Sequence, residues 1–152
     1  MPRIKRVSRT TDYILRELAR DAVEDNKACS VVALSIAAAC PYEEAFKVLE
    51  AAGRKKGNGV TYEIIFKALE ALGFRFMSIP PESFIEKYPK AHRVLKSVTT
   101  HHPDRFPSVW DDGNTYLLFT ADHVLAVKGG ENHDHTRGRA IRVKRIYRVM
   151  KK

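Results

Sequence analysis

The sequence predicts an α+β domain, and three observations lead to that class. Apolar residues recur at helical spacing in the first half of the chain, whereas short alternating segments typical of strands fill the second half. The chain has 152 residues, of which 44% are hydrophobic, enough for one domain with a substantial core. Helices early and an antiparallel sheet late therefore predict a single domain over 1–152, with a basic N-terminal arm at 1–10.

Two helices are expected first. One covers Thr11 to about Asp25. Its apolar stripe consists of Ile14, Leu15, Leu18, Ala19 and Ala22. Asp25 and Asn26 can cap the next helix, which carries Cys29 and stops before Pro41. Because this second helix is apolar on nearly every side, we expect it to be buried at the centre of the domain.

Two more helices are predicted over 42–52 and 62–72. Both are amphipathic, and each ends on a glycine suited to a left-handed C-cap, Gly53 and Gly73. A short helix is also expected over 83–88.

The strands are predicted from alternation and from the turn residues that flank them. They cover 74–79, 115–120, 123–128, a shorter segment 132–135, and 141–149. A two-residue turn at Gly129–Gly130 would pair Lys128 with Glu131, and continuing the count places Leu125 opposite Asp134.

Cys29 is the first candidate for chemistry. It stands at the head of the buried helix, where the helix dipole and the free N–H groups favour a thiolate. With Asn26 as the cap, those N–H groups and the Asn26 amide could hold an oxyanion. The alternative is that Cys29 is a small side chain of the core, as most intracellular cysteines are.

His123, 94 residues after Cys29, is the candidate base, because it opens a strand with apolar residues behind it. On the predicted register, Asp134 lies one diagonal step from His123 and within reach of it. Asp134 would then orient the imidazole as the third member of a triad. A slip of one residue would place His133 or His135 on that face instead.

A metal site is the other use of these side chains. His123, His133, Asp134 and His135 carry groups that ligate zinc, but the sequence has no compact helix-spaced pair to support them. The predicted site therefore contains no metal and no cofactor.

The net charge of +9 is concentrated at the two ends. Residues 1–9 hold four Lys and Arg, residues 137–152 hold eight, and neither segment has an acidic residue. The 127 residues between them carry 15 basic and 18 acidic side chains. The basic C-terminal strand suits an anionic partner, such as nucleic acid or another protein. Alternatively, Lys and Arg on a last strand protect a sheet edge from aggregation.

The sequence predicts a cytoplasmic protein without a membrane contact. It contains no run of 18 apolar residues, and its N-terminus lacks the apolar stretch of a secretory signal. Cys29 and Cys40 are too few for a disulfide framework, which favours a reducing compartment.

Several segments resemble the papain-like cysteine peptidases, with the closest likeness to small phage-encoded and bacteriocin-processing members. Residues 29–37, followed by 41–45, resemble the nucleophile helix and the helix after it. Residues 114–127 resemble the histidine strand, and Asp134 fits the carboxylate on the following strand. The basic ending 142–149 also resembles the small phage versions. The likeness covers roughly residues 25–149.

The resemblance implies a papain-like fold, with the Cys29 helix packed on an antiparallel sheet that carries His123. It implies a peptidase or isopeptidase acting on a peptide or protein through a Cys29–His123–Asp134 triad, in the host cytoplasm if the protein is phage-encoded. Three residues depart from the family pattern. Ala28 precedes Cys29 where many relatives have a small polar or acidic residue, and Asp122 replaces the usual Gly before the histidine. Val23 stands where larger relatives have an oxyanion Gln, for which Asn26 is a substitute candidate.

Two other functions remain open at this point. One is a catalytically inactive papain-like scaffold that binds as a phage accessory or inhibitor protein through its basic ends. The other is a cell-wall endopeptidase with the same Cys–His chemistry, although that class prefers a much shorter interval between Cys and His.

Overall fold

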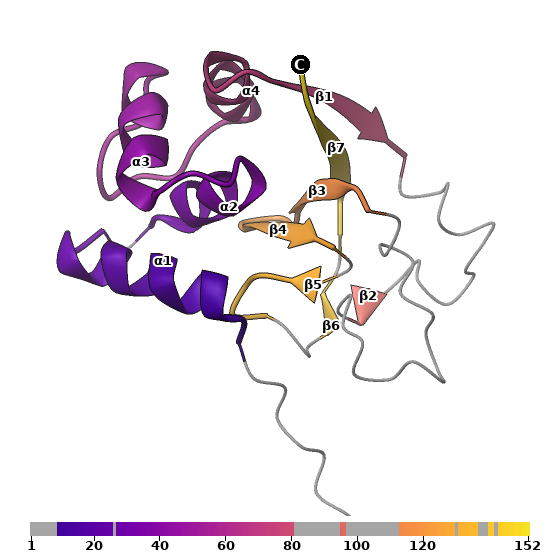
Figure 1. Ribbon diagram of the computed structural model, residues 1–152, viewed down its shortest axis with the longest axis horizontal. Helices are drawn as coiled ribbons and strands as arrows, with labels where there is room; N and C mark the ends of the chain where they lie inside the picture. The colour runs from indigo at the N-terminus through magenta and orange to yellow at the C-terminus, as the bar shows by residue number, and fades with distance from the viewer. Residues whose placement is uncertain are drawn as a thin grey trace, which may run out of the picture.

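The computed structural model describes residues 9–25, 27–80, 95–96, 113–129, 131–136, 140–141 and 143–152. In this part of the chain, four helices precede a five-stranded antiparallel sheet, which confirms the α+β class (Figure 1). The helices are α1 (Thr11–Ala22), α2 (Cys29–Ala37), α3 (Tyr42–Ala51) and α4 (Tyr62–Ala71).

The five-stranded sheet has the strand order β1-β7-β3-β4-β5, and every neighbouring pair is antiparallel. Its strands are β1 (Phe74–Ile79), β3 (Thr115–Phe119), β4 (Val124–Lys128), β5 (Glu131–Asn132) and β7 (Arg145–Lys151). A separate two-stranded sheet pairs β2 (Leu95–Lys96) with β6 (Ala140–Ile141).

The observed elements agree with most of the predicted bounds. The glycines predicted as C-caps, Gly53 and Gly73, have φ of 120° and 86°, the left-handed region that glycine favours. The predicted strand 141–149 is wrong as one element, because β6 pairs with β2 and the chain must leave that pairing before β7 joins the main sheet. The predicted strand 132–135 is also shorter, ending at Asn132 as β5. The helix predicted over 83–88 lies outside the described residues.

The helix α2 lies at the centre of the core, as its apolar composition predicts. Eight of its nine residues, Ser30 to Ala37, are buried. It packs on β4 and β3 on one side and on the three other helices elsewhere. The sheet residues that face it belong to one side of the sheet: Leu117, Phe119, Val124, Ala126, Tyr147 and Val149. Cys29, at the start of α2, is thereby held directly over the sheet.

Aromatic contacts fix α4 against the same side of the sheet. Phe66 stacks on Phe76 of β1, with ring centroids 4.1 Å apart and planes 11° from parallel. Tyr62 meets Phe119 of β3 edge-on, with centroids 4.8 Å apart. Such pairs contribute about 0.5–1.5 kcal/mol each beyond their buried area. They place the N-terminus of α4 beside the end of β3, where the site described below is found.

The apolar stripe predicted for α1 is not the face that packs. Ile14, Leu15 and Leu18 are 44%, 55% and 62% exposed. The side chains that are buried or half-buried, and so face the rest of the molecule, are Tyr13, Arg16, Glu17, Ala19 and Arg20. Long amphipathic side chains can cover a partner with their apolar stems while their polar heads reach donors or acceptors. Arg16 does so, donating to the Cys40 carbonyl at 3.2 Å.

None of the described helices is long and apolar enough to cross a membrane alone. Together α2 and α3 meet that test of length and composition, but they are bent by 113° at the break between them.

The basic C-terminal strand is not an edge of the sheet. β7 pairs with β1 on one side and with β3 on the other. Edge protection, one of the two roles considered for its Lys and Arg residues, is therefore ruled out for the described strand, because an edge strand has one unpaired side.

A fully buried ion pair joins the segment before α2 to the loop after α3. Asp25 and Arg54 have side chains that are 0% and 1% exposed, and Arg54 Nη2 donates to both carboxylate oxygens at 2.9 and 2.8 Å. The Gly57 N–H donates to the same carboxylate at 3.1 Å, and Arg54 also donates to the Lys27 carbonyl at 3.1 Å. The predicted capping role of Asp25 is thus wrong, because its carboxylate is fully engaged by Arg54 and Gly57.

We expect Asp25→Asn to lower the free energy of unfolding by about 3–5 kcal/mol, because it leaves the Arg54 charge buried without its partner. Urea denaturation measures this change. The matched control is Lys67→Ala, which removes the exposed pair formed by Lys67 and Glu63 at 3.4 Å and should change stability by at most about 0.5 kcal/mol. A loss below about 1 kcal/mol for Asp25→Asn would contradict the role given to this pair.

Candidate active site

Cys29 is the first residue of α2, and its side chain is half-buried. The helix begins two residues later than a cap at Asn26 would require, because the N-cap residue is Ala28. An alanine methyl group accepts no hydrogen bond, so the first N–H groups of α2 are not capped by that side chain. Asn26, the predicted oxyanion residue, lies outside the described residues.

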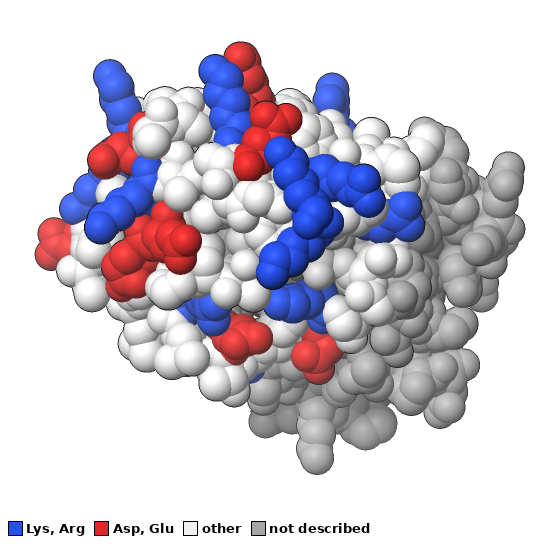
Figure 2. Space-filling view, turned by 45° about the horizontal axis from the view of Figure 1, so that its top comes forward, with Lys and Arg blue, Asp and Glu red and all other residues white. Residues whose placement is uncertain are grey.

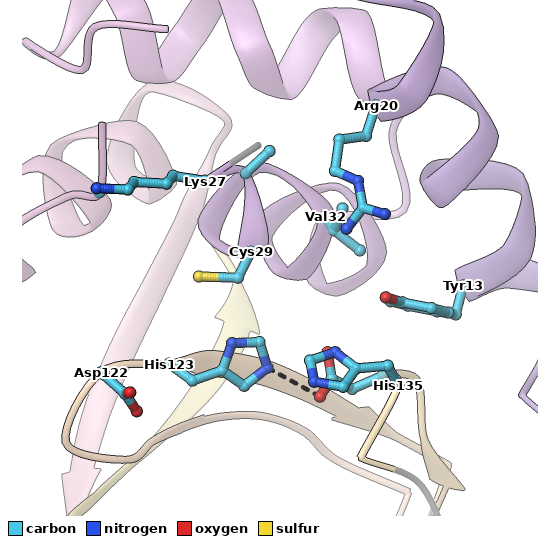
Figure 3. Close-up of a pocket in the computed structure, with 11 residues that line it drawn as sticks. Tyr13, Arg20, Lys27, Cys29, Val32, Asp122, His123 and His135 are labelled. Atoms are coloured by element: carbon cyan, nitrogen blue, oxygen red, sulfur yellow. Dashed lines mark hydrogen bonds and ion pairs between the residues drawn. The ribbon is translucent and has the colours of Figure 1, made fainter. Parts of the chain in front are cut away.

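The predicted partnership of His123 and Asp134 is confirmed. His123 Nε2 lies 2.8 Å from Asp134 Oδ2, as the dashed line in Figure 3 marks. The predicted pairing of Lys128 with Glu131 is also confirmed, and the His133 N–H donates to the Ala126 carbonyl at 3.0 Å, which continues that register.

The reason for the contact differs from the predicted one. β4 turns Val124 and Ala126 toward α2, so strict alternation would point His123 away from α2. However, His123 precedes the first residue of β4 and lies at the end of the reversal at Ala121–Asp122. The Thr120 N–H closes that reversal by donating to the His123 carbonyl at 2.8 Å. Released from the pleat, the imidazole turns toward Cys29.

The structure brings Cys29 next to His123. The thiol and the imidazole are close enough to shift each other's pKa through hydrogen bonding and charge. Since Nε2 is occupied by Asp134, the other ring nitrogen, Nδ1, faces the thiol (Figure 3). Three side chains from α2, the start of β4 and the segment after β5 thus form one continuous line.

Burial and charge act on this line in opposite directions. Burial raises the pKa of the Cys29 thiol, but the hydrogen bond and charge of His123, with a hydrogen bond from the Val124 backbone, outweigh it and lower that pKa below its ordinary value. Burial lowers the pKa of His123, but its hydrogen bonds to Asp134 and Cys29 raise it to about 10. The site therefore favours a thiolate and an imidazolium at neutral pH.

Asp134 is held by more than the imidazole. Its side chain is 5% exposed, and it accepts from the Thr136 hydroxyl at 2.7 Å and the Thr136 N–H at 3.2 Å. Burial raises the pKa of this carboxyl, but the hydrogen bond and charge of His123 and the hydrogen bond from the Thr136 hydroxyl lower it by more. The pKa of Asp134 therefore lies below its ordinary value, and the carboxyl stays ionised. Sequence reasoning missed Thr136, although an Asp followed two residues later by a Thr is a common side-chain-to-backbone turn.

Two hollows flank the thiol. The first, of about 530 Å³, is bounded by α1, the start of α2 and the segment that carries Asp134, and its lining includes Tyr13, Arg20 and His135. The second, of about 370 Å³, lies toward α4 and is lined mainly by apolar side chains, among them Val60, Ile65, Phe119 and Val124. Cys29, Gly59, Asp122 and His123 line both hollows. An extended chain lying across both would pass over Cys29.

The alternative metal ligands do not all converge. His123, Asp134 and His135 place one ligand atom each within 4.8 Å of one another, and His135 Nδ1 is 3.6 Å from Asp134 Oδ1. His133 instead bonds the Thr10 hydroxyl at 2.8 Å and the Lys128 carbonyl at 3.3 Å. By distance the first three could surround a cation, but His123 and Asp134 are already joined to each other.

No protein-family model matches this chain, and comparisons with curated proteins and with solved structures found no match. The likeness to papain-like peptidases therefore rests on the sequence segments that resemble them.

Proposed function

We propose that this protein is a papain-like thiol hydrolase that cleaves an amide bond in a peptide or protein substrate. The observation that carries the proposal is the line from Cys29 through His123 to Asp134 at the junction of two hollows. A thiol beside an imidazole that a third group orients is the arrangement that activates a cysteine nucleophile. A nucleophile helix packed on the sheet that carries the histidine also supports a papain-like fold.

The reaction would proceed in two stages. The Cys29 thiolate attacks the carbonyl carbon, whose π electrons move to the oxygen, and the imidazolium of His123 gives its proton to the nitrogen as the C–N bond breaks. The acyl group is then held as a thioester. Neutral His123 takes a proton from water as the water oxygen attacks the thioester, which releases the acid and restores the thiolate–imidazolium pair. Asp134 remains ionised throughout and keeps the ring in place.

The oxyanion would be stabilised at the start of α2. N–H groups in the first turn of a helix have no acceptor within the helix, and they lie at the positive end of its dipole. The Cys29 N–H belongs to this turn and to the same residue as the nucleophile. Asn26 remains part of the proposal as a second donor.

We expect iodoacetamide to alkylate Cys29 with an apparent pKa well below the usual value of about 8.5. The rate should change again only near pH 10, where His123 loses its proton. His123→Ala should return the thiol to ordinary behaviour, since both the hydrogen bond and the charge are removed. Measurement of alkylation across pH 4–10, with Cys29→Ser to subtract Cys40, tests this expectation. An ordinary pKa that His123→Ala leaves unchanged would refute the proposed nucleophile.

We expect Asp134→Asn to lower the rate of amide cleavage by at least about tenfold, because an amide no longer stabilises the imidazolium. A library of fluorogenic peptides supplies the substrate. The matched control is Asp122→Asn, which removes the other carboxylate beside His123; among the described residues Asp122 bonds Thr120 at 3.5 Å rather than the imidazole. Equal losses in the two variants would show that only local negative charge matters, and the orienting role of Asp134 would be wrong.

A second candidate function is binding of an anionic partner by the same fold without catalysis. Arg75 and Arg148 lie on the side of the sheet that faces away from the helices, and Lys152 ends the chain beyond β7. Figure 2 shows Lys and Arg side chains grouped in the part of the view where β1 and β7 lie.

If this surface binds nucleic acid, we expect the logarithm of the affinity to fall with the logarithm of salt concentration by about 0.9 for each phosphate contacted. Fluorescence anisotropy with a labelled duplex measures the slope. Replacing Arg75, Arg148 and Lys152 by Gln should reduce the slope as well as the affinity, whereas Lys47→Gln, on α3, should change neither. Binding that is absent or independent of salt would exclude this second function.

A further inference from the structure

The polar face of α1 forms one wall of the larger hollow beside Cys29. Tyr13 and Arg20 come from that face, and His135 closes the hollow from the opposite side, with its ring centroid 6.4 Å from that of Tyr13. Figure 3 shows Arg20, Tyr13 and His135 on one side of Cys29, and Lys27 and Asp122 on the other. The guanidinium of Arg20 points into the hollow, toward Tyr13 and His135 (Figure 3).

The acidic groups near this end of the hollow mostly have cations of their own. Asp134 is paired with His123 at 2.8 Å. Glu17, which lies close to the Tyr13 hydroxyl, is paired with Arg9 at 3.0 Å.

The remaining acid, Asp21, is the neighbour of Arg20 in the chain and contacts it at 3.3–3.4 Å. The Asp21 side chain is 63% exposed, and an exposed pair of this kind is weak and easily exchanged. The Arg20 charge is thus available to a ligand in the hollow.

We infer that Arg20, assisted by His135, recognises a carboxylate of the substrate, and this inference rests on the proposed hydrolase function. The substrate class is then a peptide with an acidic side chain or a chain terminus in the larger hollow. A guanidinium fits a carboxylate by two parallel hydrogen bonds, which a lysine cannot reproduce.

The second hollow supports a substrate whose two sides differ in charge. Its lining beyond the shared residues is apolar or carries hydroxyl groups, and among the described residues it includes no Arg or Lys. The two sides of Cys29 therefore differ in charge, and a peptide with an acidic group on one side and an apolar residue on the other fits one direction of binding better than the reverse.

Three thiol reagents of nearly equal size test this inference without a known substrate. N-iodoacetyl-glutamine α-amide is neutral, N-iodoacetyl-glutamate α-amide has only a side-chain carboxylate, and N-iodoacetyl-glutamine with a free acid has only a terminal one. We expect at least one charged reagent to alkylate Cys29 about fivefold faster or more than the neutral reagent, since hydrogen bonds to charged groups are the stronger ones. The faster of the two charged reagents identifies the source of the carboxylate.

The variants separate recognition from general attraction to a basic protein. Arg20→Gln should bring the rates of the charged and neutral reagents together, and Arg20→Lys should restore only part of the difference. Arg16→Gln removes the same charge from the same helix, four residues away, where the guanidinium faces the Cys40 carbonyl, and should keep the full preference. Circular dichroism and thermal melting confirm that each variant is folded.

The outcomes distinguish the two proposals. A neutral reagent that reacts rapidly in a His123-dependent way, with no preference that Arg20→Gln removes, would overturn the carboxylate site alone. Reaction of all three reagents at the rate of an ordinary thiol, unaffected by His123→Ala, would overturn the hydrolase itself. If Arg16→Gln and Arg20→Gln lose the preference for a charged reagent equally, that preference reflects only the net charge of the protein. This outcome would also overturn the proposed carboxylate site.

Discussion

The buried ion pair between Asp25 and Arg54 is the contact on which the position of Cys29 depends. The cost of removing both charges from water is offset by the bonds of Asp25 to the guanidinium and the Gly57 N–H, and by those of Arg54 Nη2 to Asp25 and the Lys27 carbonyl, while the buried Arg54 Nε has no partner among the described residues. These bonds fix Asp25 and Lys27, four and two positions before Cys29, to the loop after α3. Because the N-cap of α2 is an alanine, the helix start is located by this pair rather than by its own cap.

The same constraint shapes the hollows on both sides of the thiol. Gly59, which follows the pinned loop, lines both of them, so the segment fixed by Arg54 forms part of their common wall. On the other side, Glu24 stands immediately before Asp25 with a φ of 56°, a conformation that costs a non-glycine residue of order 1 kcal/mol or more. The chain accepts that strain where α1 ends and turns back toward α2. The Glu24 N–H donates to the Asp21 carbonyl at 3.1 Å and the Asp25 N–H to the Arg20 carbonyl at 3.3 Å, so a local C-terminal motif holds Glu24 in this conformation although it is not a glycine.

Much of this fold and part of the site follow from local patterns in the sequence. The helices, the glycine caps and the register of β4 with β5 are local, and that register predicts that Asp134 lies near His123, although the contact forms only because His123 leaves the pleat of β4. The remainder depends on contacts between distant segments. Nothing in the sequence near Asp25 indicates that Arg54 binds its carboxylate. His123 leaves the pleat of its strand because the chain reverses at Ala121–Asp122, and an alternating pattern does not predict where such a reversal ends. The orientation of α1 was missed because its stripe of Ile and Leu suggested the buried side, whereas long polar side chains provide the packing.

The electrostatic state of the site explains why the orientation of α1 matters for function. With Cys29 as a thiolate, His123 as an imidazolium and Asp134 ionised, the three groups carry a net charge of −1 beside the larger hollow. An anionic substrate entering this hollow would be repelled, and the repulsion would be strong because the groups are largely buried. Arg20 offsets that charge from the opposite wall. If α1 had packed through its apolar stripe, the guanidinium would face solvent, and the same three residues would favour neutral or cationic substrates.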